Sequence, residues 1–261
     1  MKYGMPTLVE CKTLEDCAKV ADELKLDFIE INMSFPEYTP EAFDIEGAVN
    51  LARKYNIFYT IHADEALNPF DFNSTVSDCY FEVMRGTLDT AKRIGARVIN
   101  LHLQKGIYVT LTDRVILLTD VYKEKYLDRV RAFVTMCEEE LKGTDIKIAI
   151  ENVDSNPFTS SQREALRIFL LSPVFALTLD TGHELKLGFK DSDVYATYPD
   201  KLLHMHLHDC KGGSPHVPLG TGELDTESKL ASLRGDTCLI EVKTVEGLKE
   251  SVEYLLAHGL K

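Results

Sequence analysis

The histidine-rich stretch LLHMHLHDCKG, from Leu202 to Gly212, carries His204, His206 and His208 at every second position. Alternate side chains of an extended strand point to the same side, so the three imidazoles share one face. Three polar rings are an unusual choice for a hydrophobic core, and they indicate one wall of a polar pocket. We expect His206 to point into this pocket and His204 to be packed and hydrogen-bonded below it. His208 is expected near the mouth, beside a ligand side chain or the substrate.

Acids and further histidines end other apolar runs of the chain. Unpaired acids brought together would repel one another and acquire raised pKa values, and a divalent cation removes that repulsion. Carboxylate and imidazole ligands suit Mn²⁺, Zn²⁺, Co²⁺ or Mg²⁺, while the absence of cysteine ligands disfavours a structural zinc. The residues concerned are His62 in YTIHAD, His102 in VINLHLQ, Glu151 in IAIENV, Asp180 and His183 in LTLDTGH, and Glu241 in LIEVK.

The elements that must position these residues form a regular alternation. Short apolar or β-branched runs alternate with longer segments whose apolar residues recur at helical spacing, most clearly over Thr75–Gly95, Tyr126–Leu141 and Val245–Leu256. The predicted strands are Pro6–Val9, Asp27–Asn32, Ile57–His62, Arg97–Leu103, Ile146–Glu151, Val174–Asp180, Lys201–His208 and Thr237–Val242.

Strand and helix in alternation imply parallel strands joined by helical crossovers. Eight such units predict an α/β fold, a (β/α)₈ TIM barrel, as a single domain over residues 1–261. An open doubly wound sheet fits less well, because no GxGxxG turn follows the first strand. In a parallel barrel all the strand ends that carry acids and histidines open on one face.

One segment interrupts the alternation after the fourth strand. Residues Gly106–Asp120, GIYVTLTDRVILLTD, contain two β-rich runs that meet around Asp113 and Arg114. They predict a small inserted hairpin where a loop could cover the barrel mouth. The alternative is an irregular start to the next helix.

Composition limits the class of protein. The chain has 44% hydrophobic and 27% charged residues, typical of a soluble globular protein, and no apolar run long enough to span a membrane. The N-terminus lacks the apolar core of a signal peptide and the cysteines form no CxxC pair, so we expect a cytoplasmic protein with reduced thiols. A net charge of −13 argues against non-specific binding to nucleic acid.

The motifs IEN, LDTGH, HMHLHD, HVPLGTGELD and IEV, in this order on successive strands, resemble the xylose isomerase-like TIM barrels. That superfamily includes sugar isomerases and epimerases and, more distantly, the endonuclease IV family. The resemblance extends from the second strand to the last helix. It implies a small carbohydrate as substrate, and it leaves open whether that sugar is phosphorylated.

In the isomerase and epimerase branch, the resemblance implies one divalent metal, commonly Mn²⁺, held by Glu151, Asp180, His206 and Glu241. The same two glutamates would serve as catalytic acid and base. The metal would polarise a substrate carbonyl and acidify the neighbouring C–H, giving a metal-stabilised enediolate that is reprotonated on the next carbon or the opposite face. His183 could hold a substrate hydroxyl or the bridging oxygen. Lys211 is expected either to bind a terminal oxygen or a phosphate, or to be a solvated loop lysine.

The endonuclease branch implies the alternative function, zinc-dependent phosphodiester cleavage at abasic DNA. Its further metal positions correspond to His62, His102, His183 and His216, with Ser214 standing where that branch carries an aspartate. A neutral hydroxyl in place of an anionic ligand weakens the third metal position. A third interpretation is a non-catalytic sugar-binding barrel. Exposed barrel helices also leave a homo-oligomer open.

Overall fold

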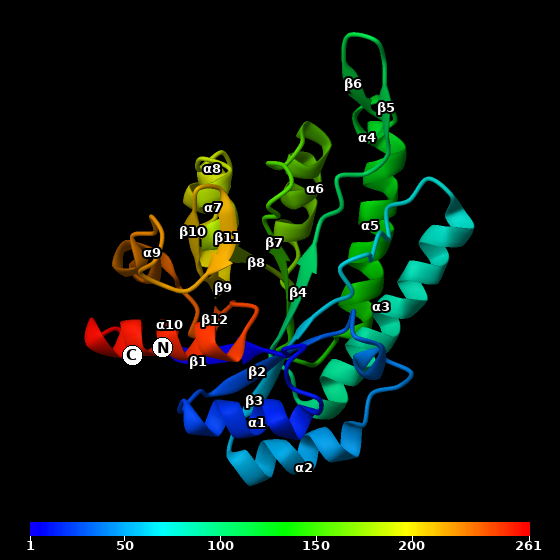
Figure 1. Ribbon diagram of the computed structural model, residues 1–261. Coiled ribbons are helices and arrows are strands. Elements are labelled where there is room, and N and C mark those ends of the chain that lie inside the picture. Colours follow the sequence, from blue (N-terminus) through cyan, green and yellow to red (C-terminus); the bar gives the residue numbers. More distant parts are fainter.

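Eight parallel strands close into a barrel in the computed structural model, which describes residues 1–261 (Figure 1). Around the barrel the strands follow the order β1-β12-β9-β8-β7-β4-β3-β2. This confirms the predicted (β/α)₈ barrel. The strands are β1 (Lys2–Pro6), β2 (Phe28–Asn32), β3 (Phe58–His62), β4 (Val98–His102), β7 (Lys147–Glu151), β8 (Phe175–Asp180), β9 (Leu202–Leu207) and β12 (Thr237–Ile240).

The first strand was predicted at Pro6–Val9 and lies earlier, at Lys2–Pro6. Tyr3 and Met5 are buried, whereas Val9 is 81% exposed in the turn that follows. The pairing of β1 with β12 and β2 explains the difference, because it places Gly4 directly beneath the Phe28 ring. The β-branched residues Thr7 and Val9 therefore gave a wrong prediction for the first strand, because the closure of the barrel decides which residues pair.

Helices cover the outside of the barrel, and side chains cap the first turns of most of them. Thr159, for example, accepts a hydrogen bond from the amide of Gln162, whose side chain accepts one from the Thr159 amide in return. The helices are α1 (Leu14–Glu23), α2 (Ile45–Tyr55), α3 (Ser74–Ile94), α4 (Leu118–Val121), α5 (Lys123–Glu140), α6 (Ser160–Leu171), α7 (Thr181–Lys186), α8 (Ser192–Thr197), α9 (Thr226–Ser232) and α10 (Val245–Ala257), with 3₁₀ turns η1 (Pro36–Tyr38) and η2 (Pro199–Lys201).

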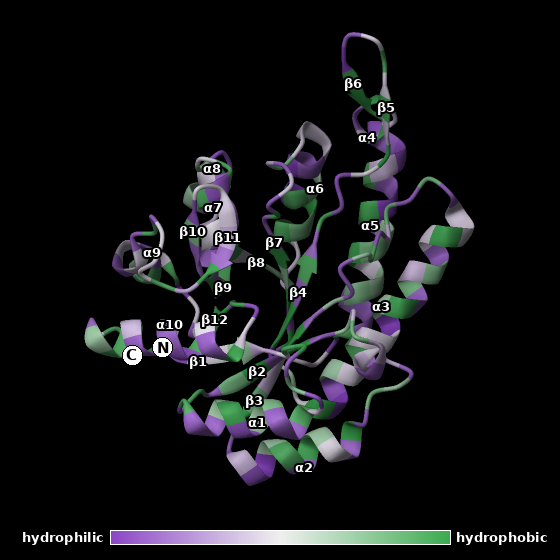
Figure 2. Ribbon diagram, viewed as in Figure 1, coloured by the Kyte–Doolittle hydropathy of each residue, from purple (hydrophilic) through white to green (hydrophobic).

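Each long helix buries one apolar face against the strands, and Figure 2 shows the strands as the more hydrophobic layer. Met84, Leu88 and Ala91 of α3 are buried, as their helical spacing predicts, although Val76, the first apolar residue of this helix, is 39% exposed. Between α5, α6 and the barrel, the rings of Phe169 and Phe175 lie 4.8 Å apart. Each such buried side chain contributes about 1.5–3 kcal/mol through the area removed from water.

The predicted insertion is a hairpin of β5 (Tyr108–Thr110) and β6 (Val115–Leu117), paired antiparallel through Val109 and Ile116. It stands away from the barrel at the top of Figure 1. The prediction of a hairpin at this place is confirmed, and the alternative of an irregular helix start is wrong.

A second hairpin, which the sequence analysis did not predict, follows β9. Strands β10 (Asp209–Lys211) and β11 (Ser214–Val217) turn at Gly212 and Gly213, whose φ values are 56° and 81°. A glycine pair at positive φ is a common hairpin turn because it has no Cβ to clash. The turn brings the chain back over the barrel mouth. None of the helices is long and apolar enough to cross a membrane.

Candidate metal centre

The four side chains predicted to bind a metal come from four strands at the same end of the barrel. Asp180 and His206 are paired neighbours on β8 and β9, and His206 also faces Leu239 of β12. Glu151 ends β7 and Glu241 directly follows β12. Because all eight strands run the same way, these ends meet over the barrel axis. All four side chains are buried.

The donor atoms of this group converge. His206 Nδ1 lies 3.2 Å from Glu151 Oε1 and 2.9 Å from Glu241 Oε2. One donor atom from each of Glu151, Asp180, His206 and Glu241 lies within 4.8 Å of the others. The three facing atoms of Glu151, His206 and Glu241 are buried and have no hydrogen-bond partner of suitable geometry. Buried polar atoms without partners cost free energy. A divalent cation held by Glu151, Asp180, His206 and Glu241 would satisfy all of them, so this donor set fits one.

Glu30 of β2 is a member of the cluster that the sequence analysis missed. Its Oε1 lies 3.0 Å from His206 Nε2, and its Oε2 lies 3.2 Å from His204 Nε2 and accepts a 2.8 Å hydrogen bond from Thr60. His204 is packed and hydrogen-bonded as expected, with its Nδ1 2.8 Å from Thr237 Oγ1. The available signal was an acid in the middle of the apolar strand FIEIN.

The position of Glu30 determines which nitrogen of His206 faces the other ligands. A carboxylate beside one imidazole nitrogen fixes the tautomer and the ring orientation, and it makes the other nitrogen a better ligand. Here Glu30 takes Nε2, which leaves Nδ1 for the group of four.

His62 and His102 lie against the other oxygen of Glu151. His102 Nε2 is 3.0 Å from Glu151 Oε2 and His62 Nε2 is 3.6 Å from it, while the Asn100 amide donates to the same oxygen. The two histidines and Glu151 form a second group of donor atoms able to hold an ion. Asn100 is the other residue here that the strand-end pattern did not single out.

His183, His208 and His216 form a third group. His208 Nε2 lies 2.9 Å from Asp180 Oδ2, and the rings of His208 and His216 stack 4.1 Å apart. His183 Nε2 is 3.3 Å from His216 Nε2. Of the two roles expected for His208, contact with a ligand side chain is the one observed, and its side chain is fully buried just beyond the end of β9.

The cation beside the cluster is Lys243, not Lys211. Lys211 is exposed on β10 and forms no hydrogen bond or ion pair. Lys243 Nζ lies 2.7 Å from Glu241 Oε1. Lys243 follows Glu241 by two residues, in the short segment between β12 and α10.

Burial and charge set the protonation of the cluster. Burial lowers the pKa of His206, but the charges of Glu151 and Glu30 outweigh it and raise this pKa well above its ordinary value. Burial raises the pKa of Glu241, but the charge on His206 and its hydrogen bond lower it well below the usual range. Burial lowers the pKa of His216 to about 4, so this imidazole is neutral near pH 7. Without a bound cation, His206 is protonated, and its positive charge lies among the carboxylates of Glu30, Glu151 and Glu241.

Two cavities open above the cluster. The first, here called the Lys243 chamber, has a volume of about 380 Å³ and reaches the cluster at Glu30, His62, His216 and Glu241. The second, here called the Tyr108 chamber, has a volume of about 370 Å³ and reaches it at His102 and His183. Glu241 is 8% exposed at the chamber floor, whereas Glu151 is 1% exposed beneath it.

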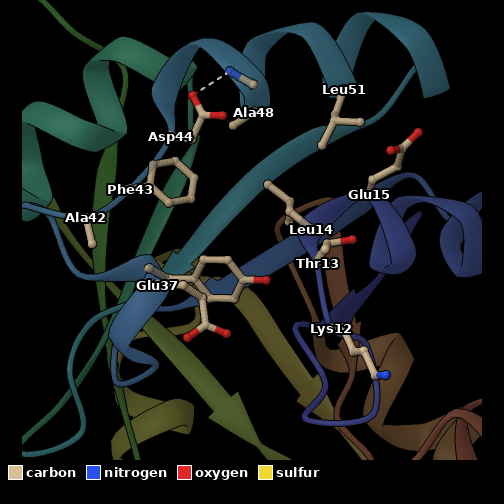
Figure 3. A pocket seen from close by; sticks show the side chains of 12 residues that line it. Lys12, Thr13, Leu14, Glu15, Glu37, Ala42, Phe43, Asp44, Ala48 and Leu51 are labelled. Carbon is tan, nitrogen blue, oxygen red and sulfur yellow. Dashed lines mark hydrogen bonds between the residues drawn. The ribbon is translucent and has the colours of Figure 1, made fainter.

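A third cavity of about 380 Å³ lies between the starts of α1 and α2 (Figure 3). Its side chains include Thr13 and Asp44, both of which accept hydrogen bonds from helix amides as N-caps. No histidine lines it, and none of the clustered acids does. It is therefore separate from the candidate metal centre.

The sequence of the chain also matches a known protein family. A family model described as xylose isomerase-like TIM barrel matches residues 18–258. The chain therefore belongs to the xylose isomerase-like TIM barrel family, and the resemblance seen in the motifs is confirmed.

Three solved structures illustrate how closely the fold is shared. A D-tagatose 3-epimerase-like protein is 22% identical and superposes with a TM-score of 0.78 over 99% of this chain and 97% of that one. The IolI protein with a bound zinc atom is 18% identical, with a TM-score of 0.74 over 98% and 94%. D-Allulose 3-epimerase from Methylomonas sp., in complex with D-allulose, is 16% identical, with a TM-score of 0.72 over 99% and 96%. Among curated protein sequences, none is significantly similar to this chain.

Proposed function

We propose that this protein is an enzyme, a divalent-metal-dependent sugar isomerase or epimerase that acts by proton transfer next to a carbonyl group. The observation that carries the proposal is the convergence of Glu151 and Glu241 on His206 Nδ1, each with an unpartnered oxygen facing this nitrogen. Two carboxylates beside one cation can act as the base that removes a proton and the acid that returns one.

The cation would be held by Glu151, Asp180, His206 and Glu241, with Mn²⁺ and Zn²⁺ as the expected ions and Co²⁺ or Mg²⁺ as alternatives. When bound, it would polarise the substrate carbonyl and lower the pKa of the adjacent C–H. The similar structures with a tagatose-type epimerase name, bound zinc and bound D-allulose support this assignment of chemistry.

The side chains around the cation would have different roles. Glu241 opens to the Lys243 chamber, so it reaches the substrate from that side and takes or returns the proton there. The Lys243 ammonium, 2.7 Å from Glu241 Oε1, keeps that carboxylate ionised and ready to accept a proton. Glu151, held by Asn100 and His102, serves on the opposite face. His183, which borders the Tyr108 chamber, is placed to hold a substrate hydroxyl.

The direct test replaces each carboxylate by its amide. Glu151→Gln and Glu241→Gln should keep the fold, weaken metal binding and lower turnover by about 10²-fold or more, because acid–base catalysis of this kind contributes 10²–10⁴-fold. The assay is hydrogen exchange at sugar C–H bonds in heavy water, followed by NMR over a set of ketoses and aldoses. Glu139→Gln, at an exposed position of α5, is the matched control. Unchanged activity in either cluster variant would remove that residue from the proposed role.

A second candidate is zinc-dependent cleavage of DNA at abasic sites. Two additional groups, His62 with His102 and Glu151, and His183 with His208 and His216, favour it because they could hold further ions. The carboxylates of the cavities and the net charge of −13 count against binding a phosphate backbone.

Ser214→Asp tests whether the third group is a metal position that has lost one ligand. Ser214 is exposed on β11, two residues before His216, so a carboxylate there would lie on the same short strand as that imidazole. If the site is otherwise preserved, the variant should bind one more zinc per chain than the parent. Equal zinc content, measured by elemental mass spectrometry, would mean that this loop does not serve such a site. Cleavage of an abasic oligonucleotide by the parent would favour the second candidate.

A further inference from the structure

The two chambers above the candidate metal centre share one lining residue. Glu65 borders both of them. Asn32 Nδ2 donates a 3.1 Å hydrogen bond to Glu65 Oε1, and the Gln104 amide donates to the Glu65 carbonyl oxygen. The Ser34 hydroxyl also accepts a 3.0 Å hydrogen bond from the Glu65 amide. Histidines of the cluster line both chambers, His62 and His216 in the first and His102 and His183 in the second.

The volumes of the chambers suit two sugar units. About 380 Å³ for the Lys243 chamber and about 370 Å³ for the Tyr108 chamber each correspond to roughly a dozen water molecules, at about 30 Å³ per water. That space is ample for one hexose ring with its bound water. A single monosaccharide would occupy one chamber and leave the other to solvent.

The Tyr108 chamber has the lining that a sugar ring needs. Gln104, Ser155 and Asn156 offer amide and hydroxyl groups for sugar hydroxyls, and Tyr108 presents a ring that is 55% exposed. Sites for small ligands combine such apolar surfaces with a few placed polar groups. The Asn156 side chain is fixed by a 2.9 Å hydrogen bond from its Nδ2 to the Pro157 carbonyl, which leaves its Oδ1 toward Ser155.

The charges in both chambers disfavour a phosphate. Lys243 is paired with Glu241 at 2.7 Å in the first chamber. In the second, Asp154 is paired with Lys186 at 2.7 Å, and Glu65 adds another carboxylate. Lys105, whose Nζ lies 5.5 Å from the centroid of the Tyr108 ring, is the one cation there without an ion pair. A dianionic group would meet more negative than free positive charge.

We propose that the substrate is an uncharged saccharide of two rings, a glycoside of the sugar that reacts. The reacting unit occupies the Lys243 chamber, where Glu241 is accessible, and the second unit occupies the Tyr108 chamber. This inference rests on the proposed function, since it assigns the substrate class of the same site. It makes Tyr108 and Asn156 determinants of specificity that touch the second ring.

The test compares each ketose with its own glycoside in the heavy-water exchange assay on the metal-loaded protein. D-Fructose, its 4-O-glucosyl derivative maltulose and fructose 6-phosphate are the first set, followed by other ketohexoses in the same three forms. We expect kcat/KM for the glycoside to exceed that for the free ketose by about tenfold or more. The phosphate ester should be the poorest of the three.

Tyr108→Ala and Asn156→Ala should each remove about tenfold of the kcat/KM for the glycoside, mainly through KM. Tyr122→Ala is the matched control, an exposed tyrosine of the same region that borders neither chamber, and it should change nothing. Equal kcat/KM for free and glycosylated ketose, or equal behaviour of the Tyr108 and Tyr122 variants, would overturn the two-ring assignment and leave the proposed function standing. Absence of exchange with every sugar would overturn both.

Discussion

The imidazole of His206 has carboxylates on both of its nitrogens, and this is the feature on which the candidate site depends. Glu30 holds Nε2 from inside the barrel, while Glu151 and Glu241 face Nδ1 from the mouth. The strand-end acids could be predicted from the sequence because parallel strands align their C-terminal ends. Glu30 could not, because it contacts His204 and His206 across the barrel interior from a strand 174 residues earlier in the chain.

Glu30→Gln tests the positioning of His206. The amide removes the negative charge that the carboxylate places 3.0 Å from His206 Nε2, so we expect metal affinity to fall by about 10–100-fold with the four ligands intact. Titration of the metal-free protein with Co²⁺, followed by its visible absorption spectrum, measures both affinity and ligand geometry. Glu41→Gln on the exposed surface is the control. The metal-free variant and the metal-free parent should unfold at similar temperatures. An unaltered Co²⁺ affinity and spectrum in the variant would contradict a positioning role for Glu30.

The elements follow from hydrophobic periodicity where it is long and regular. The barrel strands from β2 onward, the long helices and the β5–β6 hairpin lie within a few residues of their predicted ranges. The first strand and the β10–β11 hairpin lie outside the predicted ranges. The place of β1 depends on its pairing with β12, a tertiary contact that overrides local propensity. The β10–β11 hairpin turns at Gly212–Gly213, a local turn signal that the strand prediction did not use.

Gly4→Ala tests the packing that sets the place of β1. A Cβ at this position would overlap the Phe28 ring, so the variant should lose about 1–3 kcal/mol of unfolding free energy, as overpacked cores do. Urea denaturation measures this loss. In a Phe28→Leu background the smaller side chain makes room, and the same change should cost clearly less. An equal cost in both backgrounds would mean that the ring of Phe28 is not what excludes a side chain at residue 4.

The whole molecule is a barrel whose open end gathers histidines and acids over two cavities. The net charge of −13 and the carboxylates at the mouth favour a neutral ligand over nucleic acid. In the proposed function, metal binding, proton transfer and recognition of a second sugar unit all take place at this end of the barrel, beside Glu241. Each of these would depend on a cation held among Glu151, Asp180, His206 and Glu241.

The most direct measurement is therefore the metal content per chain, by elemental mass spectrometry, of protein purified without added metal and again after incubation with Mn²⁺, Zn²⁺, Co²⁺ or Mg²⁺. We expect about one tightly bound divalent ion per chain, because one group of four buried donors fits one cation. Asp180→Ala, which removes one donor, should lower this content sharply. No retained ion under any of these conditions, or full retention by the Asp180→Ala variant, would contradict a metal-dependent enzyme centred on these residues.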